Sequence, residues 1–168
     1  QQAISALGYQ PNTLARSLVN GRTNTVGVII PHSGEYIFAH PFFTEVLRGI
    51  AEVLSTNNYN LLLFLAYDKV PYARLYFQRQ VDGLILMSIP AGDANLRGIY
   101  NSGVPFVCTC RLTEEDRITN VVDADFTDGV EQGMEHLISL GHRRIALLPG
   151  PMSLISVRLR RRGYQNAL

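Results

Sequence analysis

The chain has 168 residues, of which 46% are hydrophobic and 17% charged, a composition typical of a folded globular protein rather than a disordered one. No run approaches the roughly 18 apolar residues that a membrane span needs, and the N-terminus lacks the order of regions found in a secretory signal. These features predict a cytoplasmic protein with no membrane segment. Cys108 and Cys110 lie two positions apart in an apolar run, where strand alternation would point both to the same face, which favours structural thiols over a redox pair or a metal site.

The formal net charge of +1 hides an uneven distribution of charge along the chain. All 14 acidic residues lie between Glu35 and Glu135, so Arg16 and Arg22 near the N-terminus have no acidic neighbours in sequence. The C-terminal region carries six unopposed arginines: Arg143, Arg144, Arg158, Arg160, Arg161 and Arg162. Both ends therefore favour anionic partners.

Short apolar runs alternate with amphipathic segments from residue 26 onward. The strands are expected at 26–30, 60–66, 84–87, 105–109 and 144–148, and the helices at 42–55, 72–80, 94–101, 127–140 and 156–168. Strands that are apolar at nearly every position and separated by helices indicate a parallel sheet with helices on both faces, hence the α/β class. Because the chain ends inside or just after the last expected helix, the strand at 144–148 would have few partners, and we expect a piece of a longer protein.

The segment before the first strand has the spacing of a short basic helix. Asn12 is a good N-cap and Gly21 suits a position beyond a helix end, while Leu14 and Leu18 lie four residues apart on one face. A helix over 12–20 is shorter than the about 12 to 15 residues that an isolated helix needs in water, so it must form against a surface. That surface is either the protein's own core or a partner.

The arm LGYQPNTLARSLVNGRTNTVGVIIP resembles the junction between headpiece and effector domain in LacI/GalR-family transcriptional regulators. The resemblance continues through HPFFTEVLRGI, VDGLIL, SGVPFV, EHLISLGHRRIALLPGP and RLRRRGYQNAL and covers nearly the whole chain. It implies a two-lobed, periplasmic-binding-protein-like type I fold with an incomplete second lobe. The implied parts are the end of a DNA-binding headpiece (1–10), a hinge helix and linker (11–25), the N-terminal lobe (26–122) and the start of the C-terminal lobe (123–168).

The resemblance implies a role in DNA binding for the arm. In this family the hinge helices of two protomers pair in the minor groove, where a leucine matching Leu18 wedges between base steps and kinks the duplex. Leu14 and Ala15 match positions that line the groove or the paired helix, and Arg16 matches one that reaches backbone or partner. The implied DNA-contacting set also includes Tyr9, Asn12 and Thr13. The recognition helix would precede Gln1.

The resemblance also implies an effector cleft between the lobes. Phe42 and Phe43 match positions that reach toward the cleft, although either ring could instead belong to the core. Ser156 matches a hydroxyl contact, and Arg160 matches an arginine whose forked donors hold effector oxygens. For Arg158, Arg161 and Arg162 a solvated helix face is the competing interpretation. Two departures from the family pattern are Cys110, where many members carry an aspartate, and a short segment between Tyr67 and Val81.

The predicted function is that of an effector-responsive, sequence-specific DNA-binding transcriptional regulator, a repressor that senses a sugar or sugar derivative. Its partners would be operator DNA, the effector and a second copy in a homodimer, and it would be associated with the nucleoid when bound to DNA. No cofactor or metal is expected. The alternative is a solute-binding protein of the same fold. An enzyme is not expected, because phosphate-loop, GxSxG and metal-ligand motifs are absent, and Asp123 and Asp125 suit capping or hinge roles.

Overall fold

The computed structural model describes residues 21–65, 71–90, 92–109, 111 and 120–168. The expected hinge helix lies outside the described residues, as do the predicted DNA-contacting positions Tyr9, Asn12, Thr13, Leu14, Ala15, Arg16 and Leu18. Cys110 lies outside them as well, as do residues 66–70, where the short segment between Tyr67 and Val81 begins. Among the described residues, no helix combines the length and the apolar character needed to cross a membrane.

A parallel sheet of four strands forms the centre of the larger part of the molecule. The strands are β1 (Thr25–Ile30), β2 (Asn60–Leu65), β3 (Gly83–Leu86) and β4 (Phe106–Cys108), arranged in the order β2-β1-β3-β4. Val28 of β1 pairs with Leu63 on one side and with Ile85 on the other. The predicted α/β class and parallel pairing are confirmed, because every strand pair in this sheet is parallel.

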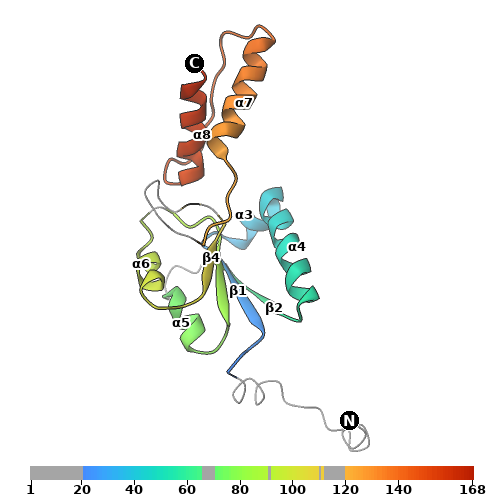
Figure 1. Ribbon diagram of the computed structural model, residues 1–168, viewed down its shortest axis with the longest axis vertical. Coiled ribbons are helices and arrows are strands. Elements are labelled where there is room, and N and C mark those ends of the chain that lie inside the picture. Colours follow the sequence, from blue (N-terminus) through green and yellow to red (C-terminus); the bar gives the residue numbers. More distant parts are fainter. Residues whose placement is uncertain (1–20, 66–70, 91, 110, 112–119) are drawn as a thin grey trace, which may run out of the picture.

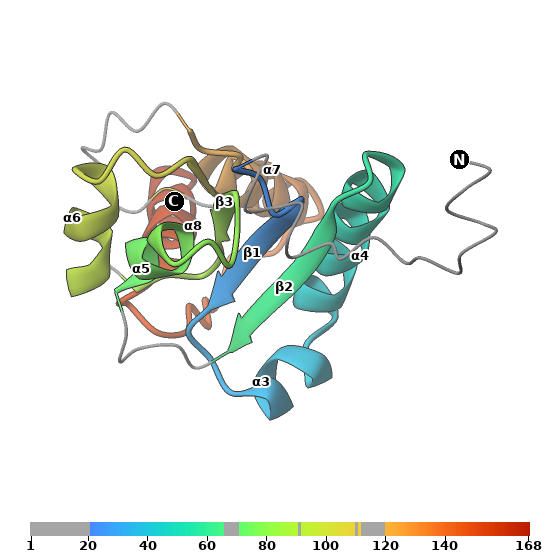
Figure 2. The same ribbon diagram turned by 90° about the horizontal axis from the view of Figure 1, so that it is seen from below.

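Helices cover both faces of the sheet, as Figure 2 shows. The helices α3 (Gly34–Ala39) and α4 (Pro41–Thr56) lie on one face, and α5 (Tyr72–Phe77) and α6 (Ala94–Tyr100) lie on the other. Successive strand residues point to opposite faces, so Val28 and Ile30 pack in the core beneath α3 and α4 while Ile29 packs in the core beneath α5 and α6. All three side chains are 0% exposed, which explains the continuous apolar run.

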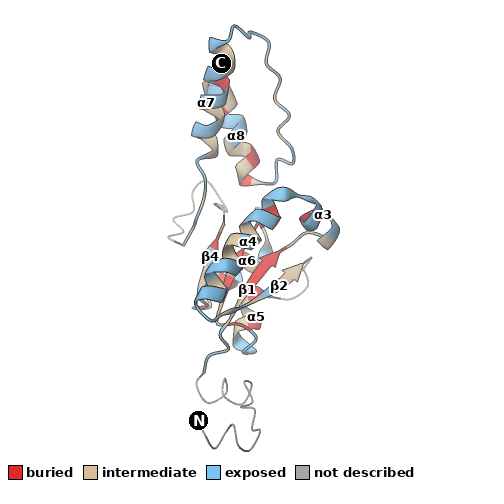
Figure 3. Ribbon diagram, turned by 90° about the vertical axis from the view of Figure 1, so that its right-hand side faces the viewer, coloured by how far each residue is buried: buried red, intermediate tan, exposed pale blue. Residues whose placement is uncertain are grey.

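Two further helices, α7 (Phe126–Ser139) and α8 (Ile155–Asn166), form a pair beyond the carboxyl end of the sheet (Figure 1). Their buried residues are few, namely Met134 on α7 and Ile155, Val157 and Gly163 on α8. Figure 3 shows the contrast with the sheet, where β1 is mostly buried. Cys108 of β4 is a fully buried thiol, as the expectation of a structural cysteine requires.

The prediction of a strand at 144–148 was wrong. The segment connecting α7 to α8 has no regular structure, and Leu148 is 95% exposed. A strand needs a hydrogen-bonded neighbour, and none of the described residues provides one for this segment. The hydroxyl of Tyr164 instead donates to the carbonyl oxygen of Ile145 at 2.6 Å, which ties the segment to α8.

Two helices also differ from the sequence-based expectations. The helix α3 was not expected, but Ser33 caps it by accepting a hydrogen bond from the backbone N–H of Tyr36 at 3.3 Å. The helix α5 ends at Phe77 rather than near Gln80. Its termination follows from Arg79, which adopts a left-handed conformation with a φ of 56° that no α-helix accommodates.

Candidate functional site

A cavity of about 200 Å³ lies at the carboxyl end of the sheet, where the sheet meets the α7 and α8 pair. Open parallel sheets bind ligands at this edge, because the loops that leave the strands converge there. Its lining residues come from the segments that follow β1, β3 and β4, from the start of α7 and from the first two turns of α8 with its N-cap. They are Tyr36, His40, Phe42, Phe43, Ser88, Ile89, Thr109, Phe126, Leu154, Ile155, Ser156 and Arg160.

The structure brings together all four residues that the sequence predicted for effector binding. Phe42 and Phe43 open α4 on one side of the cavity, and Ser156 and Arg160 lie in α8 on the other. The first pair is 113 positions or more away from the second in sequence, yet all four line the same space. The expected effector positions are therefore mutually compatible in space.

The aromatic wall of the cavity is built where α3 passes into α4. The ring of Phe43 lies 5.4 Å from that of Phe42, 5.7 Å from that of His40 and 5.9 Å from that of Tyr36, all measured between centroids. Phe43 is 4% exposed and also belongs to the core, whereas Phe42 is 47% exposed. Phe43 therefore fits both the core and the cleft interpretation, because it packs in the core and also lines the cavity.

The imidazole of His40 has a defined orientation in this wall. Its Nδ1 accepts a hydrogen bond from the backbone N–H of Phe42 at 3.3 Å, so His40 is the N-cap of α4, and Pro41 follows at the first helical position. The sequence analysis did not identify His40 or Tyr36 as lining residues. A signal was present, because HSGEYIFAHPFF places several aromatic and polar side chains directly after a buried strand.

Polar side chains that follow β3 and β4 form the wall of the cavity nearest the sheet. Ser88 follows β3 in a left-handed conformation with a φ of 51°, and Thr109 follows β4 with its backbone N–H donating to the carbonyl oxygen of Leu86 at 3.0 Å. Both are cavity-lining residues that the sequence analysis missed. Their position directly after the strands was the available signal.

The opposite wall comes from α7 and α8. The guanidinium carbon of Arg160 lies 4.6 Å from the centroid of the Phe126 ring, a distance typical of a cation–π contact. Of the arginines expected near this site, Arg160 lines the cavity, whereas Arg161 and Arg162 do not, and all three side chains are exposed. Arg158 is partly buried, with no hydrogen-bond partner for its Nε among the described residues.

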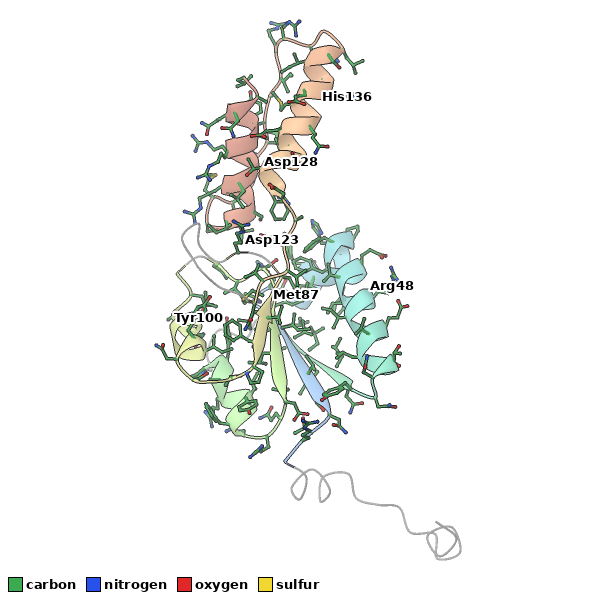
Figure 4. All side chains as sticks on the ribbon, in the orientation of Figure 1. Arg48, Met87, Tyr100, Asp123, Asp128 and His136 are labelled. Atoms are coloured by element: carbon green, nitrogen blue, oxygen red, sulfur yellow. The ribbon has the colours of Figure 1, made fainter. Side chains whose placement is uncertain are left out.

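The acidic residues near the crossover have structural roles. The Asp125 carboxylate accepts hydrogen bonds from the backbone N–H groups of Thr127 at 3.1 Å and Asp128 at 3.0 Å, which confirms the expected capping role. Asp123 accepts from the backbone N–H groups of Arg111 and Ala124, and Figure 4 places it between the sheet and the helix pair. No group of three metal-binding side chains occurs in the part of the chain that the structure describes.

Comparisons with known families and proteins agree with this architecture. Residues 23–168 match the family described as periplasmic binding proteins and sugar binding domain of LacI family. The HTH-type transcriptional regulator CelR of Thermobifida fusca is 34% identical over 172 residues, an alignment that covers 100% of this chain and 51% of CelR. The chain thus spans about half the length of the curated relatives it matches.

Two solved structures have the same fold over nearly the whole chain. The transcriptional regulator CelR–cellobiose complex superposes with a TM-score of 0.78 at 31% identity and covers 99% of this chain and 50% of that one. The lac repressor dimer bound to operator and the anti-inducer ONPF also gives a TM-score of 0.78, at 26% identity, and covers 99% of this chain and 50% of that one.

Proposed function

Because the chain belongs to the family of periplasmic binding proteins and sugar-binding domains of the LacI family, we propose that its protein is an effector-responsive DNA-binding transcriptional regulator, a repressor. The observation that carries this proposal is that Phe42, Phe43, Ser156 and Arg160 line the same cavity. The effector that these side chains suit is a sugar or sugar derivative.

The chemistry of the cavity walls supports a sugar-like ligand. Aromatic rings such as those of Phe42 and Tyr36 pack well against the apolar faces of a sugar ring, because both surfaces bury C–H groups. Ser156 and Thr109 carry hydroxyl groups that can donate or accept hydrogen bonds. Arg160 offers paired donors to two neighbouring oxygens of the ligand.

The proposed coupling to DNA runs through the relative orientation of the two parts that form the cavity. A ligand that contacts both walls favours one orientation of the α7 and α8 pair relative to the sheet. In a homodimer this change alters how the two N-terminal arms meet. The affinity for operator DNA then shifts by a coupling energy of about 1 to 3 kcal/mol, the usual range for allosteric proteins.

In this proposal the N-terminal arm binds in the minor groove of the DNA. Leu18 acts as the wedge between base steps, with Leu14 and Ala15 along the groove and Arg16 at the backbone or the partner helix. Tyr9 and Asn12 contact the DNA backbone, and Thr13 also belongs to the DNA-binding set. The absence of acidic residues before Glu35 supports this role, because acidic side chains would repel the phosphates. The protein would act in the cytoplasm, on the nucleoid.

The first test is a thermal shift of the full-length protein against sugars including cellobiose, sugar phosphates and nucleobases, repeated with operator DNA present. We expect a sugar-class ligand that raises the melting temperature and also changes the affinity for DNA. A tightly bound ligand without any effect on DNA affinity would instead support the solute-binding alternative. A ligand from another class would replace the sugar as the effector.

A pair of adjacent arginines supplies a matched control for the site. Arg160→Ala is expected to weaken the ligand found in that test by roughly 10- to 100-fold, because it removes hydrogen bonds from a charged donor. Arg161→Ala removes the same charge from an exposed position outside the cavity and should leave the affinity unchanged. Equal losses in both variants would show that Arg160 acts only through the net charge of α8.

A further inference from the structure

The contact between Arg160 and Phe126 lies within the wall of the cavity, since both side chains line it. The guanidinium carbon lies 4.6 Å from the ring centroid, so the cation rests over the ring face. We propose that Phe126 is a positioning residue, which holds the Arg160 guanidinium over its ring and leaves N–H donors of Arg160 available to the effector. This inference rests on the proposed function of the cavity.

The position of the Phe126 ring is determined by the start of α7. Phe126 is the first residue of this helix and directly follows the N-cap Asp125. The Asp125 carboxylate binds the backbone N–H groups of Thr127 and Asp128, which holds the first turn in a defined conformation. The ring therefore projects from a helical turn whose backbone is held by the Asp125 carboxylate.

The position of Arg160 is determined by the close packing of α8 against the same turn. The hydroxyl of Thr127 donates to the carbonyl oxygen of Leu159 at 3.4 Å, and at Gly163 a Cβ would overlap the carbonyl oxygen of Thr127. Near the end of α8, the Asn166 side-chain amide donates to the Glu131 carboxylate at 2.6 Å. Through these contacts, the part of α8 that carries Arg160 packs against the turn of α7 that carries Phe126.

An aromatic partner leaves more N–H donors of Arg160 available for hydrogen bonds than a carboxylate partner would. The guanidinium carries its five N–H donors in one plane, and a carboxylate would use two of them. The ion pairs given by the described residues involve Arg48 and not Arg160. Asp125 is engaged with backbone N–H groups and Asp128 accepts from the Gln132 amide at 2.7 Å, so neither competes for the edge of Arg160.

The arrangement selects for a ligand with two oxygens side by side in the guanidinium plane. Such a pair is found in vicinal sugar hydroxyls, a carboxylate or a phosphate. Holding the long arginine side chain before the ligand arrives lowers the conformational entropy that binding must remove. Loss of the ring should therefore weaken the ligand through Arg160 alone.

The test compares the full-length wild type with Phe126→Leu, Phe126→Tyr, Arg160→Met and the double variant Phe126→Leu/Arg160→Met. Crystal structures report the place of the guanidinium, and calorimetric titration with cellobiose reports affinity. We expect Phe126→Leu to displace the guanidinium and weaken cellobiose about three- to tenfold, the size of a cation–π contact. Phe126→Tyr should keep both the guanidinium position and the cellobiose affinity of the wild type. In the Arg160→Met background, Phe126→Leu should cause no further loss of affinity.

Two results would overturn the inference. One is a guanidinium that stays in place in Phe126→Leu, and the other is an equal loss of affinity from Phe126→Leu with Arg160 present or replaced. If the wild type does not bind cellobiose, this counts against cellobiose as effector under the proposed function. The role of Phe126 is then decided by the crystal structures of wild type, Phe126→Leu and Phe126→Tyr, in which the place of the guanidinium is visible without ligand.

Discussion

Gly163 shows at the level of one residue how the cavity wall depends on close packing. A side chain at this position would overlap the backbone carbonyl of Thr127 and would come within 3.1 Å of the Cβ of Val130. We expect Gly163→Ala to destabilise the folded protein by about 1 to 3 kcal/mol, because the backbone of α7 must move to accept a methyl group. Urea denaturation of the full-length protein measures this change.

Gly133 provides the control for that substitution within the same helix pair. It lies on an exposed part of α7, and among the described residues nothing lies within 4 Å of a Cβ built there. Gly133→Ala should therefore leave stability unchanged or raise it by up to about 1 kcal/mol, since alanine favours the helix. Equal effects of the two substitutions would mean that α8 tolerates a greater distance from α7.

Tyr72 and Asp93 make a second test at the residue level. The hydroxyl of the fully buried Tyr72 donates to Asp93 at 2.8 Å, and the same carboxylate caps α6 by accepting from the backbone N–H of Asn95 at 2.7 Å. Tyr72→Phe should cost about 1 kcal/mol, and Asp93→Ala about 2 to 3 kcal/mol because it removes the cap as well. The order of the two midpoints in urea checks this, and a reversed order would contradict it.

Among the elements, the segment that leads into β1 is held by one carboxylate. Asp82 accepts hydrogen bonds from the backbone N–H of Thr23 at 2.7 Å, from its hydroxyl at 2.9 Å and from the backbone N–H of Asn24 at 2.8 Å. Asp82→Ala is expected to destabilise the protein by about 1 to 3 kcal/mol and to speed amide exchange at Thr23 and Asn24. Hydrogen-exchange mass spectrometry and denaturation measure the two effects.

An exposed ion pair on α4 provides the comparison for Asp82. Glu52 lies 3.6 Å from Arg48, and both side chains are largely exposed, as Figure 4 shows for Arg48 on the outer side of the helix. Glu52→Ala should change stability by no more than about 0.5 kcal/mol, because water screens such pairs. If it matched the effect of Asp82→Ala, the bonds to Thr23 and Asn24 would contribute nothing specific.

On the scale of the whole molecule, we expect the N-terminal arm to contribute to DNA binding and not to the stability of the folded part. In the intact dimer, Leu18→Ala should lower operator affinity by about tenfold or more and reduce DNA bending, because the wedge between base steps is lost. Gel-shift and bending assays measure both quantities, and the melting temperature of the effector-binding part should not change. A large drop in melting temperature with unchanged bending would place Leu18 in the protein core.

The sequence by itself determined the α/β class and the approximate positions of the four strands of the sheet, and it suggested four effector positions. Local information was sufficient for β1 to β4 and for most of the helices, because the period of apolar residues and the caps are properties of short segments. Phe42, Phe43, Ser156 and Arg160 were identified through resemblance, whereas the arrangement of all four around one cavity required the fold.

Only the tertiary structure decided the features that depend on neighbours distant in sequence. The segment 144–148 is apolar enough for a strand, but pairing requires another strand beside it, which the described residues do not supply. Phe126 lies just before the helix expected at 127–140, and its place under Arg160 depends on how closely Gly163 lets α8 approach α7. A sequence pattern records which face of an element is apolar, whereas the identity of the partner across that face is settled only when the elements pack.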